Sequence, residues 1–164
     1  MSQVTLKGTI VHTSGHLPNE GEKAPEFSLV DQNLNEKTLD SYTGKRKVIN
    51  TFVSIDTGTC ANSVRQFNKE VSQLENTVVL CISKDLPFAF KRFCGAEGVE
   101  NVETLSAYNS SFSKDYGLEF IDSGLKGLCS RAIIILNEQN EVIYKEQVPE
   151  TSEEPNYKAA LAVL

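Results

Sequence analysis

The sequence predicts an α/β fold, in which helices flank a central mixed β-sheet. Two apolar, β-branched segments, 46–54 and 77–83, each precede a segment with helical character. Residues 131–148 then form two apolar runs around a polar turn, which is typical of an antiparallel hairpin. This order combines parallel and antiparallel strands in one sheet. The length of 164 residues fits a single domain, 1–164, with its own hydrophobic core.

The N-terminal part predicts short hairpins ahead of the first long strand. Residues 4–8 (VTLKG) and 9–13 (TIVHT) form two strands around a glycine turn. Residues 26–39 form two more, joined by the polar turn 31–36. The segment 46–54 follows, and its apolar composition predicts a central strand covered on both faces.

Two helices are predicted around the strand 77–83. Helical periodicity over 61–74 places apolar side chains three or four positions apart, at Val64, Phe67, Val71 and Leu74. Residues 85–95 predict a shorter helix, with Pro87 in its first turn and Gly95 as its stop.

The C-terminal third predicts a helical turn, a hairpin and a closing helix. The helical turn lies at 111–117, and the hairpin 131–148 turns at 138–140. The closing helix lies within 153–164 and begins near Pro155. These elements complete the mixed sheet and its helical cover.

Composition and charge exclude several classes of partner. Hydrophobic residues make up 40% and charged residues 23% of the chain, which are ordinary values for a globular protein. The net charge of −6 disfavours nucleic-acid binding and gives no basic patch for a membrane surface. The longest apolar runs, such as 132–136, are too short to span a membrane, and residues 1–18 lack an export signal. We therefore expect a cytoplasmic protein.

The four cysteines stand at positions 60, 81, 94 and 129, and no two form a C-x-x-C motif. Neither the thioredoxin redox motif nor a zinc-knuckle spacing is present. His12 and His16 are four residues apart, but the glycine and proline around them disfavour a helix, and no third ligand is evident. The sequence therefore predicts no metal site.

The stretch SIDTGTC, residues 54–60, places Cys60 where a strand ends and a helix begins. Open α/β sheets carry their chemistry at such junctions. The free N–H groups and the dipole of the helix favour a thiolate over a thiol there. Asp56 and Thr57 are candidate helix caps. Cys60 is therefore a candidate nucleophile; the alternative is a small buried residue at a helix start.

The other cysteines and one arginine carry weaker signals. Cys94 ends the basic segment 91–94 and is either an exposed reactive thiol or part of an apolar helix face. Cys81 is predicted to be an inert core residue, whereas the exposure of Cys129 stays open. Arg131 opens a very apolar strand, where its side chain either reaches solvent or directs its guanidinium at an anion.

Several motifs together resemble the bacterial thiol peroxidases, the atypical two-cysteine branch of the peroxiredoxins. They extend over nearly the whole chain and include VTLKG, GEKAPEFSLVD, SIDTGTCANSVRQFN, ISKDLPFAFKRFCGAEG, SRAIIIL, VIYKEQV and EEPNYKAAL. The pair SIDTG-x-C and DLPFA-x-KRFC is the most specific. The resemblance implies a thioredoxin-like fold with an added N-terminal β-hairpin.

The resemblance also implies the roles of four residues. It makes Cys60 the peroxidatic cysteine and Cys94 the resolving cysteine of the same chain. It assigns Thr57 and Arg131 to hydrogen-bonding of the peroxide and the thiolate. It further implies hydroperoxide substrates, thioredoxin as the reductant, a homodimer, and no metal, haem or flavin cofactor.

The chain departs from the family pattern at two positions. Val53 stands where the family signature begins with proline, seven residues before the catalytic cysteine. Cys129 stands where relatives usually carry an apolar residue. Three alternatives are weighed against a peroxidase: a thioredoxin-type disulfide oxidoreductase, a non-enzymatic redox-sensing module, and a thiol metal site. The first lacks its C-x-x-C motif, and the cysteine spacing disfavours the third.

Overall fold

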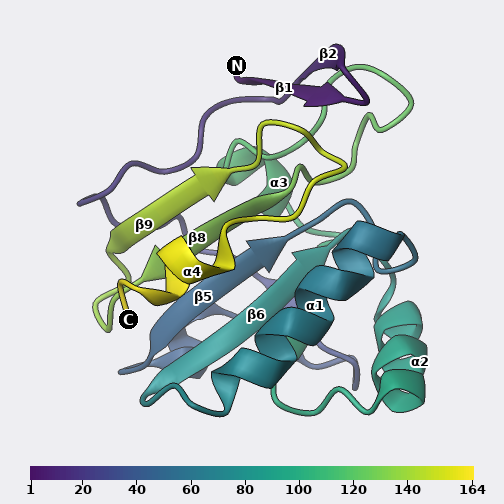
Figure 1. Cartoon of the computed structure of the whole chain (residues 1–164). Helices are drawn as coiled ribbons and strands as arrows, with labels where there is room; N and C mark the ends of the chain where they lie inside the picture. The colour runs from purple at the N-terminus through teal and green to yellow at the C-terminus, as the bar shows by residue number, and fades with distance from the viewer.

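A computed structural model describes residues 1–164 and has a seven-stranded mixed sheet at its centre (Figure 1). Its strand order is β4-β3-β7-β6-β5-β8-β9. The strands are β3 (Leu29–Val30), β4 (Glu36–Lys37), β5 (Arg46–Thr51), β6 (Thr77–Ser83), β7 (Glu103–Ser106), β8 (Ala132–Leu136) and β9 (Val142–Gln147). β5 pairs in parallel with β6 and antiparallel with β8. The predicted mixed central sheet is therefore confirmed.

The predicted N-terminal hairpin is also present, as a separate two-stranded sheet above the main one in Figure 1. It consists of β1 (Gln3–Leu6) and β2 (Thr9–His12). Lys7 and Gly8 form its turn with positive φ angles of 50° and 83°, which match the twist of a tight hairpin. Val4 and Val11 are buried and attach the hairpin to the main core.

The helices are α1 (Gly58–Val71), α2 (Pro87–Glu97), α3 (Phe112–Asp115) and α4 (Tyr157–Leu161), with a 3₁₀ helix at Leu39–Tyr42. α1 and α4 lie on the same face of the sheet (Figure 1), where the rings of Phe67 and Tyr157 pack edge to face. The predicted apolar stripe of α1 is buried at Val64, Phe67 and Val71. None of these helices combines the length and the hydropathy needed to cross a membrane.

The boundaries of two helices differ from the prediction. α2 continues through Gly95 and ends at Gly98, whose φ of 66° is left-handed and whose N–H bonds to the Cys94 carbonyl. A glycine stops a helix only where it takes that conformation, and Gly95 does not. α4 begins at Tyr157 because the Asn156 side chain accepts the Ala159 N–H and caps the helix.

Strand β7 was not predicted from the sequence. It has four residues and no alternation of apolar and polar side chains. It forms because β6 pairs with it in parallel and β3 pairs with it from the other side. Tertiary pairing, not local propensity, makes this strand.

Candidate functional site

Cys60 and Arg131 meet at the end of the sheet where β5 gives way to α1. Cys60 lies in the first turn of α1 and is 0% exposed. Arg131 directly precedes β8, is 3% exposed, and donates a hydrogen bond from Nη2 to the Cys60 sulfur at 3.1 Å. The pairing of Thr51 with Ala132 across β5 and β8 brings the two residues together. A buried cation on the sulfur stabilises a thiolate.

The other two nitrogens of the Arg131 guanidinium differ in their hydrogen bonds. Nε donates to the backbone carbonyl of Thr151 at 3.1 Å. Nη1 is buried and has no hydrogen-bond partner in the protein. A planar guanidinium fixed through two of its nitrogens can donate from the third to another oxygen near the sulfur. Of the two roles considered for Arg131 in the sequence, the structure shows the guanidinium directed at Cys60.

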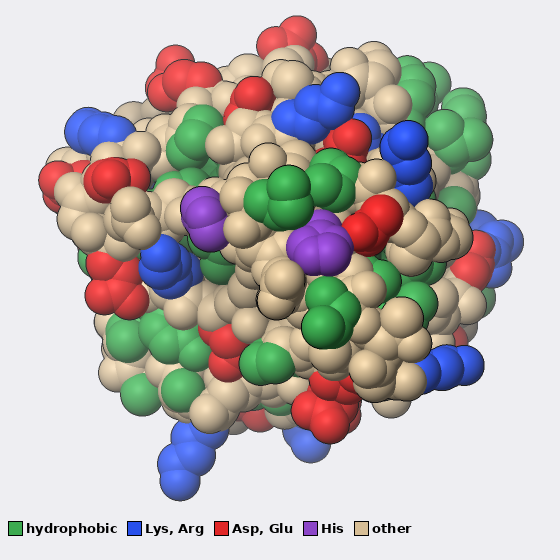
Figure 2. Space-filling view, turned by 90° about the horizontal axis from the view of Figure 1, so that it is seen from above, with side chains coloured by type: hydrophobic (Ala, Val, Ile, Leu, Met, Phe, Trp, Pro, Cys, Tyr) green, Lys and Arg blue, Asp and Glu red, His purple; other side chains and the backbone are tan.

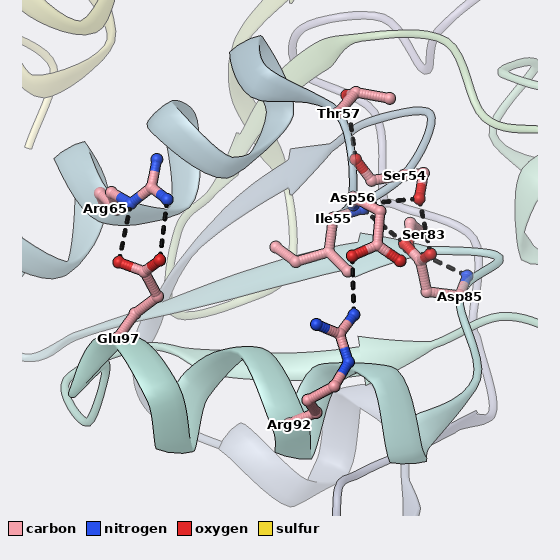
Figure 3. A network of polar contacts seen from close by, with 9 residues as sticks. All are labelled: Ser54, Ile55, Asp56, Thr57, Arg65, Ser83, Asp85, Arg92 and Glu97. Carbon is pink, nitrogen blue, oxygen red and sulfur yellow. Dashed lines mark hydrogen bonds and ion pairs between the residues drawn. The ribbon is translucent and has the colours of Figure 1, made fainter.

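Asp85 anchors the loop that carries the site (Figure 3). Its carboxylate accepts hydrogen bonds from the Ser54 hydroxyl and the Ile55 N–H, both at 2.8 Å, and from the Ser83 hydroxyl. These contacts tie the loop after β5 to the end of β6. No sequence motif named above includes Asp85, although an acidic residue just after a buried parallel strand is a pattern that indicates such a role.

Thr57 is the N-cap residue of α1, but its side chain makes no capping hydrogen bond. Its hydroxyl donates to the Ser54 carbonyl at 3.0 Å and contacts neither Cys60 nor Arg131 through a hydrogen bond. The lone pairs of this oxygen stay free to accept a hydrogen bond. With Ile55, Gly58 and residues of α1 and α2, Thr57 lines a hollow of about 330 Å³.

Two ion pairs join the Cys60 region to α2, as Figure 3 shows. Arg92 of α2 binds Asp56 at 2.7 Å, so this carboxylate is paired rather than acting as the helix cap considered from the sequence. Arg65 of α1 binds Glu97 of α2 through both Nε and Nη2, at 3.1 and 3.0 Å. The hydrogen bond from Arg65 lowers the pKa of Glu97 below its usual range. Charged groups at the surface therefore join α2 both to α1 and to the loop that precedes it.

Cys94 is a buried residue of α2, 5% exposed, so the exposed thiol considered from the sequence is wrong. Burial raises the pKa of the Cys94 thiol, although hydrogen bonds with Thr104 and Gln32 partly lower it. Its partners lie on β7 and in the β3–β4 turn, whereas the partner of Cys60 precedes β8. In the sheet, β5 and β6 lie between β7 and β8 and so separate the partners of the two thiols. All four cysteines are free, so the structure shows the reduced form of the chain.

Cys81 and Cys129 are both 0% exposed. Burial raises the pKa of each thiol to about 12, so neither supplies a thiolate at neutral pH. An inert, buried Cys81 is what the sequence predicts, whereas for Cys129 the sequence does not decide the exposure, and the structure shows it buried.

The two histidines lie together on the face that carries the N-terminal hairpin (Figure 2). His12 pairs with Asp122 at 2.6 Å, and His16 hydrogen-bonds to the Ser2 hydroxyl at 2.8 Å. The structure contains no group of three or more His, Cys, Asp or Glu residues close enough to hold a metal ion. The histidines are thus satisfied by side-chain partners away from Cys60.

Known proteins are similar to this chain over its whole length. The family model described as Redoxin matches residues 19–161. A thiol peroxidase of Corynebacterium glutamicum is 49% identical over 164 residues, covering 100% of this chain and 99% of the relative. The crystal structure of a peroxiredoxin-like protein from Aquifex aeolicus is 34% identical, covers 99% of this chain and 95% of that chain, and has a TM-score of 0.94. A thiol peroxidase from Chromobacterium violaceum is 25% identical, covers 98% and 94%, and has a TM-score of 0.88.

Proposed function

The chain belongs to the redoxin family and is a thiol-dependent peroxidase of thioredoxin-like fold, and on this premise we propose that Cys60 is the residue that peroxide oxidises. The observation that carries the assignment is the hydrogen bond from the buried Arg131 guanidinium to the Cys60 sulfur at 3.1 Å. Among the four cysteines, only this one lies in the first turn of a helix with a cation on its sulfur. Helix N–H groups and the guanidinium together stabilise the thiolate.

The oxidation step uses the groups around that sulfur. The Cys60 thiolate attacks one oxygen of a hydroperoxide, an S–O bond forms, and the O–O bond breaks. The leaving alkoxide or hydroxide takes up a proton and departs as an alcohol or water, while Cys60 becomes a sulfenic acid. The free Arg131 Nη1 donates to the peroxide oxygens as charge develops on them, and the Thr57 oxygen accepts a hydrogen bond from the peroxide.

The resolving step uses Cys94. Its thiol condenses with the Cys60 sulfenic acid, which releases water and forms an intrachain disulfide. A disulfide requires Cα atoms within about 7 Å of each other. Because the thiols contact groups on either side of β5 and β6, part of α1 or α2 moves before the bond forms.

The catalytic cycle needs an external dithiol. We propose thioredoxin, which reduces the Cys60–Cys94 disulfide by thiol–disulfide exchange. This recycling requires a reducing compartment, and we propose the cytoplasm. We also propose that residues 1–164 form a single domain and that two copies of this domain form a homodimer. The exposed apolar side chains of Leu86 and Phe88 at the start of α2 support it, because they leave apolar surface for a second copy to cover.

The experiment is a peroxide-consumption assay with purified thioredoxin, thioredoxin reductase and NADPH, run on wild type, Cys60→Ser and Cys94→Ser. Cys60→Ser loses all turnover, because a serine hydroxyl is not ionised at neutral pH. Cys94→Ser still consumes one equivalent of peroxide but does not turn over with thioredoxin. Full turnover of Cys60→Ser contradicts the assignment of the nucleophile.

Peptide mapping after one equivalent of peroxide identifies the resolving thiol. We expect a Cys60–Cys94 disulfide, with Cys81 and Cys129 still reduced. A Cys60–Cys129 disulfide as the main product shows that another thiol resolves the sulfenic acid. Reduction of protein disulfides without peroxide consumption supports the thioredoxin-type oxidoreductase instead.

A further inference from the structure

The connection 148–152, between β9 and α4, positions the arginine that contacts the thiol. Arg131 makes side-chain hydrogen bonds to two groups only, the Cys60 sulfur and the Thr151 carbonyl. The sulfur is the reacting atom, so its bond to Arg131 changes during catalysis. The Thr151 carbonyl is the remaining fixed partner, and its location determines where the guanidinium lies.

The N-terminal hairpin holds that carbonyl in place. The Thr5 N–H donates to the Pro149 carbonyl and the Thr151 N–H donates to the Thr5 carbonyl, both at 2.7 Å. Residues 149–151 thereby pair with β1 as a short parallel bridge. The same connection also reaches α1, since the Thr59 hydroxyl donates to the Ser152 carbonyl at 3.1 Å.

Glu150 fastens the connection to the turn of the hairpin. One carboxylate oxygen accepts from the Thr5 hydroxyl at 2.5 Å and from the Gly8 N–H at 3.2 Å. The other accepts from the Lys7 N–H at 2.8 Å and from the Ser152 N–H and hydroxyl at 3.2 and 2.7 Å.

These contacts make Glu150 a charged anchor. Its hydrogen bonds, the one from Thr5 first, hold the pKa of this carboxyl well below its usual range. Hydrogen bonds to an ionised acceptor are stronger than neutral ones. The positive φ angles of Lys7 and Gly8 point the N–H groups of both turn residues at the Glu150 carboxylate. The conformation of the hairpin turn therefore provides two donors for this one acceptor group.

We propose that Glu150 is a positioning residue for the peroxide reaction: it fixes the connection 148–152 to the N-terminal hairpin and thereby aligns Arg131 on Cys60 through the Thr151 carbonyl. The proposal rests on the roles proposed above for Cys60 and Arg131. It gives the added hairpin a part in the chemistry, although no residue of the hairpin hydrogen-bonds to the thiol.

The test compares Glu150→Gln with Glu153→Gln. The first change replaces one acceptor oxygen by an NH₂ group that faces N–H and O–H donors. The second makes the same change three residues away, at an exposed carboxylate that accepts no hydrogen bond. We expect Glu150→Gln to lower the second-order rate constant of Cys60 oxidation about tenfold, as expected for weakening one charge-assisted contact, with Glu153→Gln unchanged. An unchanged rate in Glu150→Gln overturns the proposal.

A double-mutant cycle with Arg131→Lys separates positioning from general loss of structure. If Glu150 acts through Arg131, Glu150→Gln changes the rate less than about twofold in the Arg131→Lys background. The same tenfold loss in both backgrounds overturns the proposal, because Glu150 then acts independently of Arg131. If Arg131→Lys itself leaves the rate unchanged, the role proposed for Arg131 fails, and the positioning role of Glu150 fails with it. If Arg131→Lys slows the reaction but Glu150→Gln does not, only the positioning role of Glu150 fails.

Discussion

The two cysteines assigned to the reaction lie in different surroundings. Cys60 has a cation on its sulfur and stands in the first turn of α1. Cys94 lies in the second half of α2, and its hydrogen-bond partners, Thr104 and Gln32, are neutral. Burial without a cation raises the pKa of Cys94. A cation thus faces one thiol, while burial without a cation raises the pKa of the other, and this difference supports the different roles proposed for them above.

The contacts that hold the surroundings of Cys60 and of Cys94 in place also differ. Backbone and buried contacts hold the Cys60 side: the Thr151 carbonyl on Arg131, and Asp85 on the loop before α1. On the Cys94 side, α2 packs on the core through Phe90 and Phe93, and its polar links to α1 and the loop before it are surface ion pairs, which contribute little to stability. On the roles proposed above, the Arg131 side of the site holds the thiol that reacts with peroxide, and α2 is the element proposed to move when the disulfide forms.

Arg131→Lys tests the cation on Cys60 and has the largest expected effect. Lysine keeps the charge but loses the planar group that reaches sulfur, carbonyl and substrate together. We expect the second-order rate constant with peroxide to fall about 100-fold, as for loss of one donor to a developing oxyanion. Stopped-flow kinetics measures it. Arg46→Lys, at the far end of β5, is the control, and equal rates in the two variants mean that Arg131 only supports the strand.

The pH dependence of the resolving step tests the neutral site of Cys94. Because burial raises its pKa, the thiol favours the closed helix and the thiolate favours the opened one. The closed position of α2 is therefore fully favoured below the ordinary thiol pKa, and this advantage is lost as the pH rises from that value through the raised pKa of the closed form. We expect disulfide formation after sulfenic acid formation to accelerate several-fold between about pH 8 and pH 9.5. A rate that stays flat over this range contradicts the link between Cys94 ionisation and opening.

Much of the fold was predictable because it has local causes. The period of apolar residues specifies α1, and the β-branched runs specify β5, β6 and β8. The position of Cys60 after a strand and at a helix start was equally visible. β7 was missed because its four residues form a strand only through pairing with their neighbours.

The supporting contacts of the site were not predictable in the same way. Thr151 acts through its backbone carbonyl, which every residue carries, so no side-chain pattern identifies it. Two of the partners of Glu150 are N–H groups of a turn more than 140 residues away in the sequence. The contact between Arg131 and Cys60 depends on strand order, and only the family resemblance suggested it.

Glu97→Gln tests the surface fastening of α2 and has a smaller expected effect. The change removes the ion pair with Arg65 while keeping the shape of the side chain. We expect disulfide formation to become about twofold faster, since exposed pairs are weak, with the peroxide step unchanged. Rapid-quench trapping of the sulfenic acid measures the step. Glu100→Gln, an exposed carboxylate without an ion pair, is the control, and an equal gain there argues against a specific fastening.

Val53→Pro is expected to change the peroxide step by no more than Glu97→Gln changes disulfide formation, and it concerns the loop before Cys60. Val53 is 7% exposed and stands where the family signature carries proline. β5 ends at Thr51, so valine does not extend the strand as the sequence alternatively allows. The Val53 N–H has no hydrogen-bond partner in the protein, so proline removes no contact there.

Proline at position 53 lowers the conformational entropy of the unfolded chain, while the folded loop keeps its single conformation. We therefore expect Val53→Pro to react with peroxide about twofold faster and to melt a few degrees higher, in line with typical gains from proline at compatible sites. Val53→Ala, which removes apolar cover without fixing φ, is the matched control and becomes slower. If the proline variant is no faster than wild type, valine already holds the loop well enough, and the site of Cys60 is rigid for reasons that lie in Asp85 and Arg131 alone.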